Sequence, residues 1–167
     1  DRELLAKYSR VYFLNENYIP AGLFAIDPQY NLNPQKSFSV LSGVWPHLER
    51  LFADARADGV DILLISAYRS FGEQAGIKSA YSFTYGSGAN KFSADQGYSE
   101  HQLGTTVDFI TTGLGGQLEG FETTAAYQWM LDHAHTYGFT LSYPEGNAHY
   151  IFEPWDWRFV GVKLATF

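Results

Sequence analysis

The run from Ser99 to Asp108, Ser-Glu-His-Gln-Leu-Gly-Thr-Thr-Val-Asp, constrains the fold of this chain more than any other feature. His101 and Asp108 are both metal-ligand types, but an offset of seven residues would place them on opposite faces of a regular strand. Gly104 lies between them and allows the chain to turn. The run therefore predicts a loop that carries His101, followed by a strand over residues 105–110 that carries Asp108.

A second run near the end of the sequence, Glu-Pro-Trp-Asp-Trp-Arg from Glu153 to Arg158, adds two carboxylates. We expect Glu153 on a strand over residues 149–153, surrounded by aromatic side chains. Burial there would raise its pKa toward the range that suits a general base near neutral pH. The alternative is a salt bridge between Glu153 and Arg158.

Length and composition limit the class of protein. The chain has 167 residues, the size of one domain, and 46% of them are hydrophobic, which is ample for a core. The net charge is −7 and the basic residues are scattered, so nucleic acid is not an expected partner. Cysteine is absent, which excludes thiolate metal sites, and no apolar stretch is long enough to span a bilayer. We expect a monomer.

Hydrophobic patterning predicts the α+β class, with a small, mainly antiparallel sheet flanked by helices. Apolar residues recur at helical spacing within 40–57 and again over 121–137, where Gly138 ends the pattern. The apolar run over 61–67 predicts a buried strand. The other expected elements are a helix from Phe71, a loop over 85–97, a Gly-rich loop over 111–120, strands at 139–143 and 149–153, and a short helix over 157–164.

These runs, together with Ser66-Ala67-Tyr68-Arg69-Ser70 and Gln74, resemble the signatures of the VanY-like zinc D,D-carboxypeptidases, also called LAS peptidases. The resemblance covers residues 38–163. It implies the hedgehog/D,D-peptidase-like fold, with a peptidase domain over 38–167 and residues 1–37 as an N-terminal segment that wraps the same domain.

The resemblance also implies a site and a substrate. One Zn²⁺ would be held by His101, Asp108 and Asp156, and the substrate would be a peptidoglycan stem peptide that loses its terminal D-alanine. The location would be extracytoplasmic, in the periplasm or cell wall. The remaining roles implied are those of a general base for Glu153, an oxyanion-binding residue for Arg69, and substrate-binding residues for Gln74, Ser99, Tyr68 and Trp155.

Asp156 departs from the family pattern, which has a histidine at this position. Three interpretations remain open: a metal site with altered ligation, an inactive relative that has lost the metal, or a substitution that silences an enzyme. His149 is an alternative third ligand. At the level of function, the alternatives are a peptidoglycan-binding module without activity and an endopeptidase of the L-alanyl-D-glutamate type.

Overall fold

The computed structural model describes residues 14–85, 94–147 and 150–166. Its main element is a four-stranded sheet in the order β3-β4-β6-β5, in which every neighbouring pair is antiparallel. The expected α+β class is confirmed. The strands are β1 (Leu23–Ala25), β2 (Ser39–Leu41), β3 (Leu63–Ser66), β4 (Thr106–Ile110), β5 (Phe139–Tyr143) and β6 (Glu153–Phe159), and the α-helices are α2 (Trp45–Ala57), α3 (Phe71–Tyr85), α4 (Ala125–His133) and α5 (Val162–Ala165).

Five short 3₁₀ helices lie in connections of the described part of the chain: η1 (Pro28–Tyr30), η3 (Glu100–Leu103), η4 (Thr112–Leu114), η5 (Phe121–Thr123) and η6 (Ala134–Tyr137). Of these, η3 matters most for the site because it carries His101.

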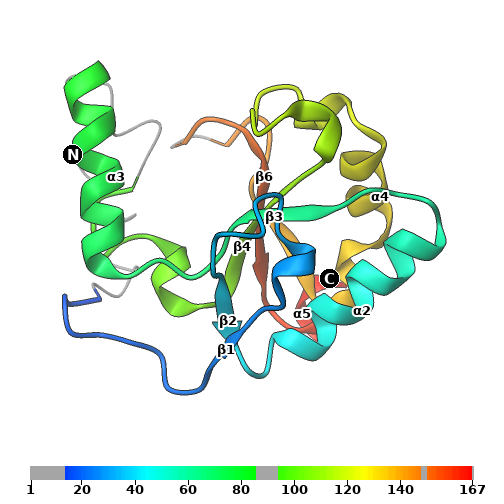
Figure 1. The fold of residues 1–167 in the computed structure, drawn as a ribbon, viewed down its shortest axis with the longest axis horizontal. Helices are drawn as coiled ribbons and strands as arrows, with labels where there is room; N and C mark the ends of the chain where they lie inside the picture. Colours follow the sequence, from blue (N-terminus) through cyan, green and yellow to red (C-terminus); the bar gives the residue numbers. More distant parts are fainter. Residues whose placement is uncertain (1–13, 86–93, 148–149, 167) are drawn as a thin grey trace.

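The hydrophobic core lies on one side of the sheet. Figure 1 shows α2 and α4 on that side and α3 on the other, apart from the rest of the molecule. Val107 and Phe109 of β4 are fully buried in this core. Asp108, between them in sequence, points to the opposite face because side chains alternate along a strand. The α3 side of the sheet therefore receives the polar residues of β4. Further core residues come from α2 and α4: Leu48, Leu51, Phe52, Ala55, Ala126, Trp129 and Met130.

The first predicted helix begins later than expected. Residues 39–41 form β2, which pairs with β1 in a separate two-stranded sheet, and the helix α2 starts only at Trp45. Pro46 lies in its first turn, where a missing N–H costs nothing. The predicted helix over 121–137 is divided into η5, α4 and η6, and it ends at Gly138, which has a φ of 88°.

The prediction for the C-terminal part was wrong in two places. The strand expected at 149–153 begins only at Glu153 and continues to Phe159, so its C-terminal half occupies residues that the sequence assigned to a helix. These residues pair with both β4 and β5, and strand pairing on both sides outweighs the local helical pattern. Gly161, with a φ of 86°, separates β6 from the short helix α5.

Candidate metal centre and cleft

Two adjacent strands, β4 and β6, bring two carboxylates of the site together. In the sheet, Asp108 of β4 lies directly opposite Ser66 of β3 on one side and opposite Asp156 of β6 on the other. Side chains at paired positions point to the same face, so the two aspartates are neighbours. Like charges at such positions repel each other, so this arrangement favours a positive charge between them.

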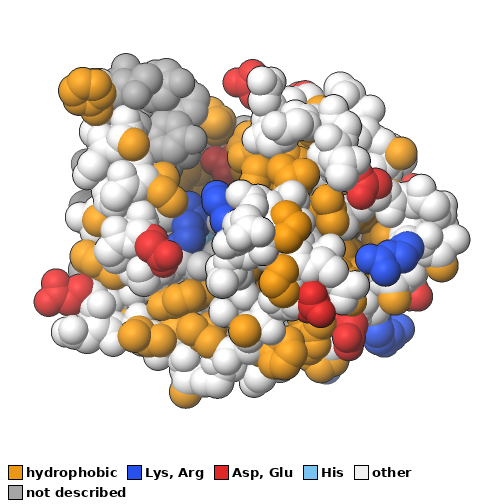
Figure 2. All heavy atoms as spheres, in the orientation of Figure 1, with side chains coloured by type: hydrophobic (Ala, Val, Ile, Leu, Met, Phe, Trp, Pro, Cys, Tyr) orange, Lys and Arg blue, Asp and Glu red, His pale blue; other side chains and the backbone are white. Residues whose placement is uncertain are grey.

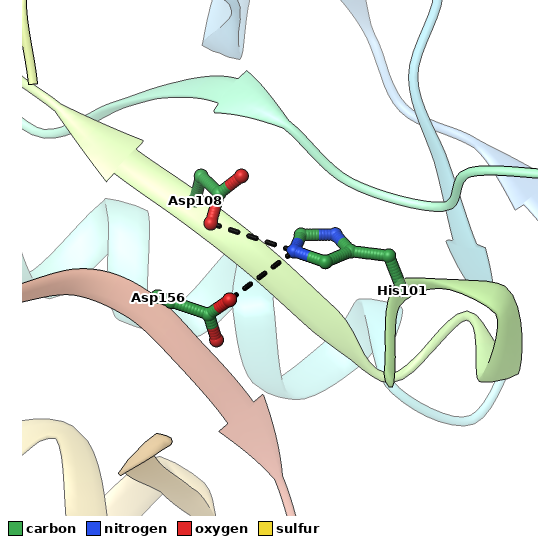
Figure 3. A group of neighbouring side chains, drawn as sticks. All are labelled: His101, Asp108 and Asp156. Atoms are coloured by element: carbon green, nitrogen blue, oxygen red, sulfur yellow. Dashed lines mark hydrogen bonds and ion pairs between the residues drawn. The ribbon is translucent and has the colours of Figure 1, made fainter. Parts of the chain in front are cut away.

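His101 supplies the third donor from η3, which ends at Gly104 in the left-handed conformation with a φ of 72°. Its Nε2 atom lies 3.5 Å from Asp108 Oδ1 and 3.3 Å from Asp156 Oδ2 (Figure 3). Nδ1 lies 2.7 Å from the carbonyl oxygen of Ala67. Since a carbonyl only accepts hydrogen bonds, Nδ1 carries a proton, and Nε2 faces the two carboxylates. His101 lies on a short 3₁₀ helix and not in the expected irregular loop, whereas Asp108 lies on the strand that follows, as expected.

This donor set fits a divalent cation. With Nδ1 protonated, a neutral His101 would aim its Nε2 lone pair at two carboxylates, so either a proton or a cation must lie between them. One buried oxygen, Oδ1 of Asp156, has no hydrogen-bond partner among the described residues. The candidate ligand atoms of His101, Asp108 and Asp156 lie within 4.8 Å of one another, and all three residues are buried. His149, the alternative ligand, lies outside the described residues.

Without a cation, a proton takes its place. Burial alone would lower the pKa of His101, but the nearby Asp108 carboxylate and the contacts to both aspartates outweigh burial and raise that pKa to about 9. Burial would raise the pKa of Asp108, yet the His101 charge outweighs this effect, and the pKa of Asp108 is lowered. The three side chains thus bind one positive charge strongly.

Glu153 enters the same cleft because β6 is irregular. Leu141 of β5 pairs with Trp157, and Tyr143 of β5 pairs with Glu153. An advance of two residues along β5 therefore corresponds to four residues along β6. This bulge is stabilised by a hydrogen bond of 2.8 Å from Trp157 Nε1 to the carbonyl oxygen of Pro154. Residues three apart face opposite sides of a regular strand, whereas Glu153 and Asp156 here line one cleft.

The environment of Glu153 suits a proton-transfer group. Burial, followed by the charges of Asp156 and Asp108, raises the pKa of Glu153 to about 8. The alternative interpretation, a salt bridge from Glu153 to Arg158, was wrong: Arg158 Nη1 binds Glu100 Oε1 at 2.7 Å.

The cleft that contains these groups has a volume of about 900 Å³ and lies between α3 and the sheet. Figure 2 shows a hollow at this place, with basic side chains along it. The cleft brings together all nine residues that the sequence indicated: Tyr68, Arg69, Gln74, Ser99, His101, Asp108, Glu153, Trp155 and Asp156. The volume lies at the upper end of the usual range for ligand sites, about 300–1,000 Å³.

Arg69 and Gln74 have different surroundings within the cleft. Arg69 Nη2 lies 3.9 Å from Asp108 Oδ2, and its buried Nε has no hydrogen-bond partner in the described residues, so donor capacity remains. Gln74 is buried, and its Nε2 donates to the carbonyl oxygen of Ala94 at 2.8 Å. Gln74 therefore also fixes α3 to the segment that leads to Ser99.

Several cleft residues were not indicated by the sequence. Tyr143 pairs with Glu153 across the β5–β6 hairpin, and its ring contacts that of Tyr150 at 4.9 Å between centroids. The predicted hairpin turn could have suggested Tyr143, but only with the correct register. Lys36 comes from the N-terminal segment, for which the sequence contained no functional signal. Both line the cleft, as do Phe38 and Leu118.

Comparison with known proteins gives a consistent result. The sequence profile of a family described as VanY, D-alanyl-D-alanine carboxypeptidase, matches residues 38–162. The putative carboxypeptidase YodJ of Bacillus subtilis is 32% identical over 169 residues, covering 97% of this chain and 62% of the relative. A D-alanyl-D-alanine carboxypeptidase of Enterococcus faecalis is 34% identical over 134 residues, covering 72% of this chain and 48% of the relative. The chain thus spans about half to three fifths of these two relatives.

Solved structures agree in fold. The LdcB LD-carboxypeptidase superposes with a TM-score of 0.82 at 31% identity, covering 93% of this chain and 75% of that chain. A mutant of the vancomycin-resistance D,D-pentapeptidase VanY, solved in complex with Zn(II), has a TM-score of 0.71 at 27% identity, covering 93% of this chain and 90% of that chain. These similarities confirm the expected peptidase fold. With a profile match over most of its length, the chain belongs to the VanY family of D-alanyl-D-alanine carboxypeptidases.

Proposed function

We propose that this chain is a metal-dependent carboxypeptidase that removes the terminal D-alanine from peptidoglycan stem peptides, and that it acts outside the cytoplasm, where that substrate lies. The observation that carries the proposal is the convergence of His101, Asp108 and Asp156 on one point, with Glu153 in the same cleft. Related proteins support it: the VanY neighbour was solved with Zn(II), and another structure is VanYB in complex with D-alanine-D-alanine.

His101, Asp108 and Asp156 would hold one divalent cation, with zinc as the first choice. When bound, such a cation acts as a Lewis acid on the scissile carbonyl and lowers the pKa of water. It would also neutralise Asp156 and Asp108, the carboxylates that help to raise the pKa of Glu153. Glu153 would then be ionised near neutral pH and ready to accept a proton.

The remaining steps belong to side chains of the cleft. Glu153 accepts a proton from the attacking water and donates it to the leaving amine. Arg69 directs donors to the developing oxyanion or to the terminal carboxylate, since its Nε is not used by other described residues. Ser99, which precedes η3, and Gln74 position the peptide, and Tyr68 and Trp155 form apolar walls for it.

The test is substitution of Glu153. Glu153→Gln should keep the fold and the metal content but lower the release of D-alanine from a synthetic stem pentapeptide by about 10²–10⁴-fold, the usual cost of losing a general base. Glu145→Gln, an exposed carboxylate in the turn after β5, is the matched control. Parent-like turnover in the Glu153 variant would exclude this assignment. Loss of metal would instead identify Glu153 as a ligand.

A second candidate concerns the bond that is cut. The TM-score is higher for the LD-carboxypeptidase LdcB than for VanY, 0.82 against 0.71. An L,D-enzyme removes the D-alanine that follows an L-centre in a tetrapeptide. Parallel assays on a stem tetrapeptide and a stem pentapeptide distinguish the two activities. Binding of both peptides without turnover, in protein loaded with metal, would favour the non-enzymatic peptidoglycan-binding module.

A further inference from the structure

Lys36 is a cation of the cleft that the proposed chemistry does not use. Two of the described residues that line the cleft are a lysine or an arginine, namely Lys36 and Arg69. Arg69 lies beside Asp108 at 3.9 Å. Lys36 makes no ion pair with any residue in the described part of the chain, although the protein as a whole carries a net charge of −7.

The backbone at Lys36 is held in place on both sides. Buried Asn31 donates from Nδ2 to the carbonyl oxygen of Lys36 at 2.8 Å, and the amide of Lys36 donates to the carbonyl oxygen of Asn33 at 3.0 Å. The amide of Leu32 donates to the carbonyl oxygen of Leu64 in β3 at 2.9 Å. The turn is therefore fixed to β3, the strand that leads into Arg69.

The acidic groups of the cleft do not neutralise this lysine. Glu73 forms a capping box with Ser70: its Oε2 accepts from the amide and the hydroxyl of Ser70, each at 2.7 Å. Of the other carboxylates that line the cleft, those of Asp108 and Asp156 belong to the candidate metal centre, and Glu153 is the proposed general base. Lys36 is an exposed lysine at a fixed turn of this cleft and makes no ion pair with a described residue, so its ammonium group is available to a ligand that brings its own carboxylate.

From this placement we infer that Lys36 binds a carboxylate that the stem peptide carries before the scissile bond, so that the chain prefers stem peptides with a free carboxylate to those in which it is amidated. This inference rests on the proposed function, because it assigns the reacting end of the peptide to the metal centre. Arg69 then serves the reacting end, and Lys36 serves the upstream part of the peptide. A lysine suits this role because its ammonium is a flexible point charge that needs no bidentate geometry.

The experiment uses synthetic stem peptides that differ only in whether the side carboxylate of the second or of the third residue is free or a primary amide. Lys36→Gln should raise KM for the acidic peptide about two- to fivefold, the range of an exposed ion pair, and leave kcat unchanged. KM for the fully amidated peptide should not change. Lys163→Gln, an exposed lysine on α5 away from the cleft, is the matched control and should affect neither peptide.

A binding measurement makes the outcome independent of turnover. Calorimetry gives the dissociation constants of the same peptides for the Glu153→Gln protein, with and without the second substitution Lys36→Gln. A selective loss of affinity for an acidic peptide supports the inference, even if no peptide is cleaved and the proposed function fails. Equal affinity for acidic and amidated peptides, or an equal loss for both in the Lys36 variant, overturns it.

Discussion

At the candidate metal centre, an aspartate at position 156 in place of a histidine changes the charge of the ligand set more than its geometry. Asp156 Oδ2 lies 3.3 Å from His101 Nε2, and its backbone is paired directly with that of Asp108, so the side chain is in position to bind a cation. Two carboxylates and one imidazole neutralise a divalent ion completely, whereas two imidazoles and one carboxylate leave one positive charge. The structure thus favours retained metal binding with altered ligation over a lost site.

The first prediction follows from this difference in charge. Asp156→His should tighten zinc binding by about tenfold or more, and affinity for Mn²⁺ should rise less, because imidazole suits zinc better than it suits harder ions. Competition with a coloured chelator measures both affinities. Asp156→Asn, which removes the charge without supplying a nitrogen donor, is the control and should weaken binding of both ions. Unchanged zinc affinity in the histidine variant would contradict Asp156 as a ligand.

A second prediction concerns the proton that His101 holds without metal. The folded-state pKa of about 9 lies above the unfolded value, so the proton stabilises the metal-free protein fully below about pH 6.5, and this stabilisation is lost as the pH rises through 9. A metal must displace the proton. Apparent zinc affinity should therefore rise about tenfold per pH unit between 7 and 9 and then level off.

Calorimetry in buffers of different ionisation enthalpy checks this directly, since about one proton should be released per zinc at pH 7. No proton release at that pH would contradict a protonated Nε2 between the two carboxylates.

For single residues, the sequence was sufficient to predict a side chain's position where the spacing along the chain alone determined that position. His101 and Asp108 were predicted from a turn glycine followed by a strand. The position of Glu153 required more, because its side chain reaches the cleft only through the β6 bulge, and a bulge depends on the partner strand as well as on local sequence. The position of Lys36 in the cleft could not be predicted, because an irregular segment has no helical or strand periodicity that indicates which way a side chain points.

Among the elements, β6 shows most clearly why the predicted strand and helix boundaries near the C-terminus were wrong. Its aromatic residues fit a strand or a buried helix equally well, and pairing with β4 and β5 decides between them. The junction between η6 and β5 depends in turn on Gly138. A Cβ at that position would lie 2.7 Å from Phe159 Cε2 and 2.9 Å from the amide nitrogen of Val162.

The third prediction tests that junction. Gly138→Ala combines a positive φ with contacts to β6 and to the chain after it, so it should lower the free energy of unfolding by at least about 1–3 kcal/mol. Gly146→Ala is the matched control: its φ is 79°, but no atom lies within 4 Å of the added Cβ, so only the backbone cost applies. Chemical denaturation measures both. Equal effects in the two variants would mean that the close packing at Gly138 relaxes without cost.

For the whole molecule, the sheet separates stability from chemistry. The apolar face of β4 packs under α2 and α4, and its other face lines the cleft beside α3 (Figure 1). No helix in the described ranges is long and apolar enough to cross a membrane. The sequence predicted this α+β organisation because burial patterns are local, but it could not predict that α3 and the turn at Lys36 form two walls of one cleft, since these contacts join distant segments.

The last prediction concerns the whole fold, because the candidate metal centre joins η3 and β4 to β6, which lies far from both in the sequence. Zinc that binds only the native state adds about 2.7 kcal/mol of stability at a free concentration of 100 times Kd. For a domain of this size, Tm should rise by about 5–10 °C. Thermal unfolding with zinc, compared with a chelator, measures the shift. Asp108→Asn should abolish most of it, whereas Asp132→Asn, on the exposed surface of α4, should preserve it. An equal shift in both variants would show that zinc stabilises the protein from elsewhere.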